Sequence, residues 1–456
     1  MPFSNVLRLS QRAKEIADII KSESGKISLV SHYDADGICA ASLMYHALER
    51  SNKDFEVIFV KQLDKDAIIN LTDKDSDMFI FTDLGSGQLS NIKEYLGEKK
   101  VVVVDHHQPV NEDWKGLYHL NPYMFGIDGT NEISGAGMSY ILATTLDKST
   151  RQFIDLAVVG AFADMQVNGN SLTGVNKMIY EDAEILGLVK KEKGLMLFGR
   201  YTKPIHKALE QCMDPFIKGI SGNESGAVRL LYELGIPLRD KNNKFRTLSQ
   251  LSRKEEKRLA TALVMELIAN GGDAEKAKSL IGDVYKIRES YEIREFATLL
   301  NACGRIGKPL EGLKFCLGLR ESADDIYQEY RKAISNAISW VSRNLNNEKH
   351  CIKTEKATYI LAGNHIMDTI IGTVLSMMIK NRIQTSVGFS FADSEGNTVK
   401  VSARSRAQEK EINLGLIIRE AASNVGGEGG GHKTAAGASI PKGTEMDFIN
   451  LAEELL

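Results

Sequence analysis

The most constraining feature of the sequence is a run of four valines at 101–104 that is followed directly by Asp105, His106 and His107. A short β-branched run between polar residues is typical of a strand covered on both faces, as in a parallel sheet between layers of helices. Ligands of such sheets bind outside the carboxyl ends of the strands. The three polar residues are therefore either a solvated turn after a core strand or a set of ligands at a sheet edge.

The pattern around this strand supports a parallel sheet. Strand-like segments at 27–31, 55–60 and 78–83 precede the valine run, and helical patterns separate them at 38–50 and after Gly87. This βαβα order predicts an α/β fold with a parallel, doubly wound sheet.

The rest of the chain divides into two further parts. From about residue 134 the pattern becomes helical, and it stays mainly helical between about 200 and 345. A second, smaller α/β pattern follows, with predicted strands at 358–363, 385–393 and 398–405, a hairpin turn at 393–396 and a helix at 413–425. Because 456 residues exceed the size of one ordinary core, we expect three domains. Their predicted boundaries are 1–190, 191–349 and 350–456.

Composition excludes several classes of protein. Hydrophobic residues make up 43% of the chain and charged residues 26%, which is typical of soluble globular domains. The net charge of -3 excludes a chain that is basic throughout, but it permits a local basic channel. The N-terminal segment predicts an amphipathic helix rather than a signal peptide, and we expect no membrane span. The five cysteines form no CxxC pair, which favours reduced thiols in a cytoplasmic protein.

Acidic residues and histidines follow each early strand of the predicted sheet. They lie in the segment from His32 to Gly37, at Asp83, in the segment from Asp105 to His107 and, after a helical run, at Asp164. The carboxyl ends of parallel strands meet at one edge of a sheet, so these side chains should converge. Clustered carboxylates repel one another and stay ionised together only where cations lie between them. The sequence therefore predicts a metal site at this edge.

The chemistry that fits this set of residues is a binuclear metal site. Two metal ions about 3.5–4 Å apart share a bridging ligand, lower the pKa of a bound water and stabilise a phosphoryl group during displacement. Mixed histidine and aspartate ligands suit Mn²⁺ or a similar first-row ion better than Ca²⁺. We expect two Mn²⁺ ions, with Mg²⁺ or Co²⁺ as alternatives.

The motifs together resemble a known superfamily. SHYDADG, the isolated Asp83, VDHH and GAFAD resemble the four motifs of the DHH phosphoesterases, and GGGHKTAAG resembles the signature of their associated substrate-binding domain. NACGR at 301–305 resembles the NAxGR motif of RecJ-like exonucleases, and the long helical middle is most similar to the archaeal RecJ-like group. That group includes nucleases that bind the GINS replication complex, and it is related to a eukaryotic replicative-helicase subunit. The resemblance implies a catalytic domain over 1–190 and a substrate-binding domain over 350–456.

The resemblance also implies a role for each strand-end residue. The first metal would be held by His32 and Asp34, the second by Asp36, His106 and Asp164, and both by a bridging Asp83. His107 would face the scissile phosphate, and Asp105 would orient a ligand histidine. Bacterial RecJ enzymes tend to have an aspartate at the position of His32.

A glycine-dense segment near the C-terminus, GGEGGGHKTAAG at 426–437, is predicted to hold phosphate. Glycines such as Gly430 and Gly431 let the backbone N–H groups approach a ligand closely, and His432 and Lys433 supply positive charge. The alternative is a flexible hairpin tip, which the metal motifs elsewhere in the chain disfavour.

Four further residues are candidates for contacts with the substrate. Arg404 follows a β-branched strand and is either a bidentate phosphate contact or an exposed strand-end residue. His365, at a strand-to-helix junction, is either a phosphate contact or a helix-capping residue. Asn301 and Arg305 belong to NACGR, and Arg305 resembles a phosphate-contacting arginine of RecJ enzymes. The alternative for Arg305 is pairing with a surface glutamate.

These observations lead to three hypotheses. The first is a metal-dependent exonuclease that cuts terminal phosphodiester bonds of single-stranded DNA, with 5′→3′ as the expected direction, and of RNA, releasing mononucleotides in DNA replication or repair. Its helical middle would also bind a partner such as GINS. The second is a phosphodiesterase for oligoribonucleotides, cyclic dinucleotides or pyrophosphate. The third is a non-catalytic replisome scaffold, which would predict decayed metal motifs.

Overall fold

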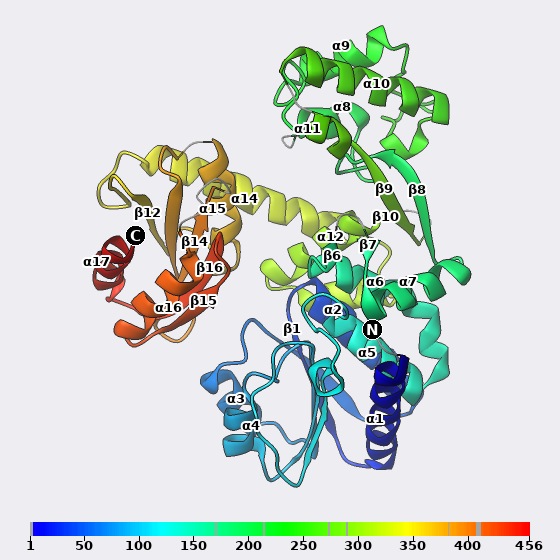
Figure 1. Cartoon of the computed structure of the whole chain (residues 1–456), viewed down its shortest axis with the longest axis vertical. Helices are drawn as coiled ribbons and strands as arrows, with labels where there is room; N and C mark the ends of the chain where they lie inside the picture. Colours follow the sequence, from blue (N-terminus) through cyan, green and yellow to red (C-terminus); the bar gives the residue numbers. More distant parts are fainter. Residues whose placement is uncertain are drawn as a thin grey trace. The chain divides into compact units, whose positions relative to one another are not determined.

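The structure is a computed structural model that describes residues 3–168, 171–212, 215–271, 274–288, 291–381, 383–406 and 412–456. The chain divides into two compact units, Met1–Ala323 and Asp324–Leu456. The helices and strands of both units are labelled in Figure 1. Within the described residues, no helix has both the length and the apolar composition needed to cross a membrane.

The core of the first unit is a parallel sheet. Its strands are β1 (Ile27–His32), β2 (Phe55–Val60), β3 (Met78–Thr82), β4 (Lys100–Val104) and β5 (Leu117–Leu120). They lie in the order β2-β1-β3-β4-β5, and all neighbours are parallel. Ser31 pairs with Thr82, and Thr82 pairs with Val104. The segments that follow β1, β3 and β4 therefore leave the same edge of the sheet at the same level.

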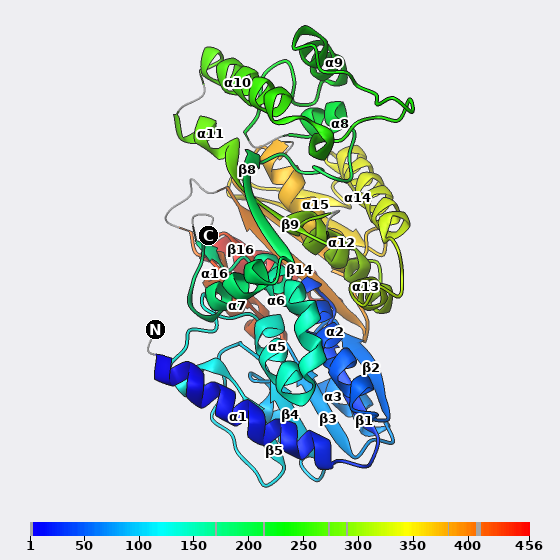
Figure 2. The ribbon, with the colours of Figure 1, turned by 90° about the vertical axis from the view of Figure 1, so that its right-hand side faces the viewer.

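Helices cover both faces of this sheet, which explains why the valine run is apolar throughout. Val101 and Val103 share a core with α3 (Lys65–Thr72) and α4 (Leu89–Leu96). Val102 and Val104 are equally buried and point to the opposite face. The helices on that face are α1 (Phe3–Ser22), α2 (Ala35–Arg50), α5 (Gly135–Leu146) and α6 (Ile154–Ala163) (Figure 2). The α/β class and the parallel, doubly wound sheet predicted from the sequence are confirmed.

An insertion with its own apolar core extends from the first unit (Figures 1 and 2). It is carried by an antiparallel ribbon of β8 (Val189–Leu195) and β9 (Ile281–Ile287), with β10 (Tyr291–Glu292) beside β9. Its helices are α8 (Ile205–Glu210), α9 (Glu224–Glu233), α10 (Arg253–Ala269) and α11 (Ala274–Ser279). The sequence predicted only helices clearly here, because residues 190–193 are exposed and charged and give β8 no apolar alternation.

Shorter elements complete the first unit. They are α7 (Gly174–Ile185), α12 (Ile293–Arg305), α13 (Pro309–Cys316), the short strands β6 (Val167–Asn168) and β7 (Ser171–Leu172), and 3₁₀ turns at Pro122–Phe125, Lys148–Phe153 and Leu248–Gln250. Helix α12 packs against α2 and α6. The NACGR segment at the C-terminal end of α12 therefore belongs to a helix that packs against α2, which follows the predicted ligands His32 and Asp34, and against α6, which precedes Asp164.

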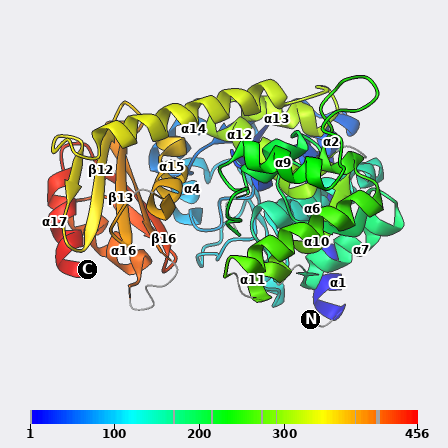
Figure 3. The same ribbon diagram turned by 90° about the horizontal axis from the view of Figure 1, so that it is seen from above.

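The second unit is a mixed sheet with helices on both faces. Its strands are β11 (Cys351–Lys353), β12 (Ala357–Gly363), β13 (Val387–Asp393), β14 (Thr398–Ser405), β15 (Glu428–Gly431) and β16 (Ala435–Pro441), in the order β11-β12-β13-β14-β16-β15. On one face lies α15 (Asp368–Asn381), which packs against the long α14 (Asp324–Asn344) (Figure 3). On the other face, α16 (Leu414–Asn424) and α17 (Glu445–Leu455) share the main apolar core. The predicted hairpin is present as antiparallel β13 and β14.

Candidate metal centre

The first ligand loop joins β1 to α2. His32 ends β1, and Asp34 caps α2 by accepting a hydrogen bond of 3.0 Å at Oδ1 from the backbone N–H of Gly37. This cap explains why α2 begins at Ala35 rather than at Ile38, where the sequence predicted its start. The other carboxylate oxygen of Asp34 lies 3.0 Å from Nδ1 of His32. The loop therefore brings a histidine and a carboxylate into contact at the sheet edge.

Asp36 lies in the first turn of α2, and its carboxylate meets the start of another helix. Its Oδ2 accepts a hydrogen bond of 2.8 Å from the N–H of Gly135, and its Oδ1 accepts one of 2.9 Å from the N–H of Ala136. These N–H groups at the start of α5 have no partner within that helix, and the positive end of the helix favours a carboxylate. A Cβ at Gly160 would lie 2.1 Å from Oδ1, so glycine is needed there.

Asp83 follows β3 and carries the least satisfied carboxylate of the cluster. Its φ of 60° lies in the left-handed region, where Asp and Asn are the most common non-glycine residues. Its side chain is 3% exposed, and among the described residues Oδ1 has no hydrogen-bond partner. A Cβ at Gly135 would lie 2.2 Å from this oxygen. A buried carboxylate oxygen without a donor fits a site that holds a cation.

Asp105 and His107 follow β4, and the carboxylate of Asp105, unlike that of Asp83, is well supplied with hydrogen-bond donors. Oδ1 of Asp105 accepts hydrogen bonds from the N–H of His106 at 2.8 Å, from the N–H of His107 at 3.2 Å and from Nδ1 of His107 at 2.8 Å. Its Oδ2 accepts a further bond of 2.9 Å from the N–H of Ser86. Asp105 is fully buried, whereas the side chain of His107 is 58% exposed. Asp105 thus holds the loop together and leaves Nε2 of His107 free of this contact.

His106 presents one ring nitrogen to the cluster. Its Nδ1 donates a hydrogen bond of 2.7 Å to the carbonyl of Gly129, which leaves Nε2 as the ligand atom. Nε2 lies 3.3 Å from Oδ1 of Asp83, 3.8 Å from Oδ2 of Asp164 and 4.0 Å from Oδ2 of Asp36. A single nitrogen therefore faces three carboxylates.

Asp164 directly follows α6, and its side chain is held by a residue that the sequence patterns did not indicate. Nε2 of Gln166 donates to Oδ2 of Asp164 at 2.8 Å and to the carbonyl of Gly129 at 2.8 Å. Oε1 of Gln166 accepts a bond of 2.7 Å from Nδ2 of Asn176. Gln166 thus joins the carboxylate of Asp164 to the carbonyl that orients His106.

The structure brings together all the strand-end residues that the sequence predicted as one cluster. Their ligand atoms form three overlapping groups: His32, Asp34 and Asp83; Asp36, His106 and Asp164; and Asp83, Asp105, His106 and His107. Asp83 and His106 each belong to two of these groups. Shared membership is the arrangement expected of ligands for adjacent ions.

The electrostatics of the cluster also fit divalent cations. Burial, reinforced by the Asp164 and Asp34 carboxylates, raises the pKa of Asp36 to about 6. Burial raises the pKa of Asp83 well above its usual value, and the charges of Asp36 and Asp34 add to this effect. Burial lowers the pKa of His32, but the adjacent Asp34 carboxylate outweighs it and raises that pKa to about 9. Without cations, these carboxylates are ionised at a free-energy cost.

The predicted substrate contacts in the first unit lie on α12. Asn301 is half-buried, and its Oδ1 accepts a hydrogen bond of 3.0 Å from the backbone N–H of Ala35, between two ligand residues. Arg305 is the last residue of α12 and is half-buried. The NACGR segment is therefore next to the metal-ligand loop.

The remaining predicted contacts lie in the second unit. Gly430 and Gly431 belong to β15, an edge strand, and His432 and Lys433 are exposed in the turn to β16. Part of the glycine-dense segment is paired within the sheet, because Gly430 pairs with Gly437 and Gly431 with Ala436. The carbonyl of Lys433 accepts a bond of 3.0 Å from the N–H of Leu414, the first residue of α16. The turn therefore adjoins the positive end of a helix.

Arg404 and His365 have partners of their own. Nε of Arg404 donates to Oγ of Ser376 at 2.9 Å, and Nη1 donates to the carbonyl of Ala403 at 2.8 Å. His365 is exposed and stacks on Trp340, with ring centroids 5.0 Å apart.

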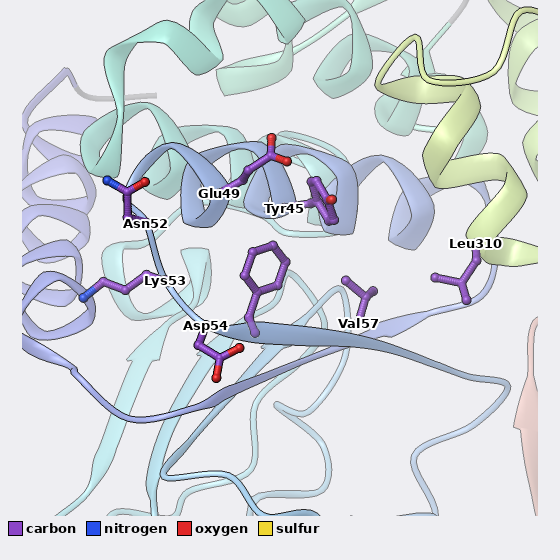
Figure 4. Close-up of a pocket in the computed structure, with 8 residues that line it drawn as sticks. Tyr45, Glu49, Asn52, Lys53, Asp54, Val57 and Leu310 are labelled. Carbon is purple, nitrogen blue, oxygen red and sulfur yellow. The ribbon is translucent and has the colours of Figure 1, made fainter.

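A pocket of about 650 Å³ lies elsewhere in the first unit, between the C-terminal half of α2 and the edge strand β2 (Figure 4). Its lining residues are Tyr45, Glu49, Asn52, Lys53, Asp54, Phe55, Val57 and Leu310. None of them belongs to the three ligand groups. The pocket is therefore separate from the metal centre.

Comparison with known proteins agrees with these observations. The DHH family N-terminal domain matches residues 26–161, the DHH-CID domain matches 197–281 and the DHHA1 domain matches 355–456. An uncharacterized protein of Methanocaldococcus jannaschii, MJ0831, is 31% identical over an alignment of 457 positions, and the match covers 97% of this chain and 96% of the relative. The single-stranded-DNA-specific exonuclease RecJ of Bacillus subtilis is 28% identical over 170 residues, which cover 33% of this chain and 21% of that enzyme.

Solved structures share the fold. The Mn²⁺ complex of RecJ from Thermus thermophilus matches with a TM-score of 0.57 at 18% identity, covering 100% of this chain and 55% of the RecJ chain. CDC45 from Entamoeba histolytica matches with a TM-score of 0.64 at 12% identity, covering 98% of this chain and 99% of that chain. The domain matches, the full-length relative and the shared fold identify this chain as a RecJ-like member of the DHH family.

Proposed function

We propose that this chain is a divalent-metal-dependent exonuclease that hydrolyses terminal phosphodiester bonds of single-stranded nucleic acid. The observation that carries the proposal is the set of three overlapping ligand groups at the carboxyl edge of the parallel sheet. The single-stranded-DNA-specific exonuclease RecJ of Bacillus subtilis, a relative over part of the chain, supports the substrate class. The Mn²⁺ complex of Thermus thermophilus RecJ supports Mn²⁺ as the ion.

The proposed metal site uses the strand-end residues in fixed roles. His32 and Asp34 would hold one ion, Asp36, His106 and Asp164 the other, and Asp83, which belongs to two groups, would bridge them. When bound, two such cations supply a hydroxide nucleophile near neutral pH and neutralise charge that develops on the phosphoryl group. Mn²⁺ suits the mixed nitrogen and oxygen donors, with Mg²⁺ or Co²⁺ as alternatives.

His107 is proposed to contact the scissile phosphate. Burial lowers its pKa, but the hydrogen bond and charge of Asp105 outweigh this effect and raise it to about 9. The imidazole is therefore protonated at neutral pH when no metal is bound, and its Nε2–H is free to donate to a phosphate oxygen. Asp105 positions this group through Nδ1.

Other parts of the chain would hold the single-stranded nucleic acid. We assign catalysis to 1–190, a connecting role to 191–349 and substrate binding to 350–456. Arg305 would contact a phosphate near the metal centre. In the second unit the segment Gly430–Lys433 would bind phosphate at the positive end of α16, together with Arg404, which lies at the same end of the sheet. His365 follows β12 at the opposite end of the sheet, so it would contact the nucleic acid at a separate point.

We further propose a role in DNA replication or repair, with GINS as a partner that binds the helical insertion. The fold that the chain shares with CDC45 is consistent with a replisome setting. Single-stranded DNA, degraded from 5′ to 3′, is the proposed main substrate, and RNA is a second substrate because its backbone carries the same phosphates.

The test is digestion of single-stranded DNA and RNA labelled at either end, with Mn²⁺, with Ca²⁺ and with chelator. We expect mononucleotide release with Mn²⁺, little with Ca²⁺, which prefers more oxygen ligands, and none in chelator. A matched duplex should resist digestion. Full activity in chelator would refute the metal-dependent mechanism, and cleavage of only cyclic or very short substrates would favour a small-substrate phosphodiesterase.

A non-catalytic scaffold is the second candidate, favoured by the similarity to CDC45 over almost the full length of both chains. The complete set of ligand residues argues against it, because a scaffold has no use for buried carboxylates at a free-energy cost. A well-folded protein that binds GINS but neither Mn²⁺ nor single strands would support the scaffold.

A further inference from the structure

We infer that Asn301 is a positioning residue that fixes the loop carrying His32, Asp34 and Asp36. The inference deepens the proposed metal-dependent function and rests on it. It gives one residue of the NACGR segment, Asn301, the role of positioning the metal ligands, and it leaves the phosphate contact to Arg305.

The first observation is a hydrogen bond between distant parts of the chain. The N–H of Ala35 donates to Oδ1 of Asn301 at 3.0 Å. Ala35 is the first residue of α2, and an N–H group at that position has no partner within its own helix. Because a backbone N–H can only donate, the side-chain amide must present its oxygen, so its orientation is fixed. This oxygen is thus occupied by the loop.

The second observation is a close approach one turn further along α12. Asn301 and Gly304 lie on the same face of this helix. A Cβ at Gly304 would lie 1.9 Å from the carbonyl oxygen of Tyr33, so only glycine lets the helix backbone reach the loop. Tyr33 is also held from the sheet, since its N–H donates to the carbonyl of Val60 at 3.2 Å.

These two contacts alternate with the ligands. In the sequence His32-Tyr33-Asp34-Ala35-Asp36, α12 contacts the backbone of Tyr33 and Ala35, the two residues that separate the three ligands. Fixing the backbone between ligands sets their spacing without using any ligand atom. A residue that holds the backbone of metal ligands in this way orients them without binding the metal itself.

Helix α12 is itself well anchored, as a support must be. Glu292 caps its N-terminus by accepting bonds from the N–H groups of Arg294 at 2.9 Å and Glu295 at 3.3 Å. Glu295 is buried and accepts bonds from the N–H of Arg200 and from Oγ1 of Thr202 at the base of the insertion. The helix therefore gives Asn301 a fixed position against α2.

The test measures Mn²⁺ affinity by calorimetry, single-strand affinity by fluorescence anisotropy in chelator, and thermal unfolding in chelator. Asn301→Ala should weaken Mn²⁺ binding about 10–100-fold, as loss of a residue that orients metal ligands usually does, with strand affinity unchanged. Gly304→Ala should weaken Mn²⁺ binding as well, because it displaces the Tyr33 carbonyl. Asn301→Asp keeps an acceptor for Ala35 and should bind Mn²⁺ at least as well as the parent protein.

Controls separate the possible outcomes. Asn270→Ala makes the same change at the C-terminal end of α10 and should behave like the parent protein. If Asn301→Ala unfolds, Asn301→Ser replaces it, because the serine side chain is too short to reach Ala35. Parent-like Mn²⁺ affinity with weakened strand binding in Asn301→Ala would overturn the inference alone. In that case Asn301→Asp should also bind strands poorly, because a carboxylate repels phosphate. A parent protein that binds no Mn²⁺ would overturn both the inference and the proposed function.

Discussion

The same substitution at Asp83 and Asp105 should change stability in opposite directions. Both residues follow buried strands at the metal edge, and their exposed fractions are 3% for Asp83 and 0% for Asp105. Oδ1 of Asp83 has no hydrogen-bond partner among the described residues. The carboxylate of Asp105, in contrast, accepts bonds from Ser86, His106 and His107.

For Asp83→Asn in chelator, we expect a gain of about 1–3 kcal/mol in the free energy of unfolding. This is the usual cost of a buried polar group left without a partner. Burial and the charges of Asp36 and Asp34 raise the pKa of Asp83 well above its usual value, so the neutral amide relieves a penalty at neutral pH. The amide also tolerates the left-handed backbone and can donate to Nε2 of His106, which lies 3.3 Å from Oδ1.

For Asp105→Asn, we expect a loss of at least about 1.5–3 kcal/mol, the value of one hydrogen bond to a charged group. Burial opposes ionisation of Asp105, but the hydrogen bond and charge of His107 outweigh it and hold its pKa below the usual value. An amide has only one acceptor oxygen, so its NH₂ group must face either the Ser86 N–H or the His107 side. The charged form is thus the one that the fold stabilises.

The assay is urea unfolding of the parent and both variants, in chelator and with Mn²⁺. Mn²⁺ should stabilise the parent but stabilise Asp83→Asn much less, because a shared ligand is lost. Asp83→Asn should also lose nuclease activity while gaining stability in chelator. If Asp83→Asn were as destabilised in chelator as Asp105→Asn, the assignment of Asp83 as a ligand rather than a structural carboxylate would be wrong.

Four further predictions follow from the geometry. Gly160→Ala should weaken Mn²⁺ binding at least tenfold in calorimetry, because the new methyl group would lie 2.1 Å from Oδ1 of Asp36; unchanged affinity would mean that Asp36 is not a ligand. Gln166→Leu should weaken Mn²⁺ binding about 10–100-fold, since it removes the donor to Asp164, whereas Gln250→Leu in the insertion should have no such effect. In chelator, the stability that His32 contributes should be fully present below about pH 6.5 and lost as pH rises through its folded pKa of about 9; the same loss in His32→Asn would show that another group titrates. Residues 196–280 can be replaced by an Asn-Gly turn, because Leu195 and Ile281 are direct partners across the ribbon; Glu295→Leu is added to avoid a buried unpaired carboxylate. This variant should keep Mn²⁺ binding and lose GINS binding in a pull-down. Retained GINS binding would place that interface elsewhere.

The sequence predicted much of the first unit because its signals are local. A β-branched run such as 101–104 can be recognised without knowing its neighbours, and parallel pairing then brings Asp83, Asp105 and His106 to one edge. The same reasoning located β12, β13 and β14 of the second unit but not β11, β15 or β16. It missed β8, where charged residues at 190–193 pair with β9 without being buried.

The supporting contacts of the site were not predictable in the same way. Asp36 is held by backbone N–H groups at the start of α5, and any residue type supplies those donors. Gln166 lies just beyond the recognised GAFAD segment, but its partner Gly129 is distant in sequence and contributes only a carbonyl. Asn301 was predicted to contact the substrate, while its hydrogen bond to Ala35 arises from the packing of α12 against α2.

Asp83 and Asp105 show what such patterns leave open. Each is an aspartate directly after a buried strand, so strand periodicity treats them alike. The structure separates them by their donors: Asp105 is surrounded by N–H groups that stabilise its charge, whereas Asp83 lies beside other carboxylates and opposite Nε2 of His106. A carboxylate satisfied by the protein stabilises the fold, and one that the protein leaves unsatisfied is available to a cation. The free energies of unfolding of Asp83→Asn and Asp105→Asn in chelator therefore distinguish a carboxylate that stabilises the fold from one that is available to bind a metal ion.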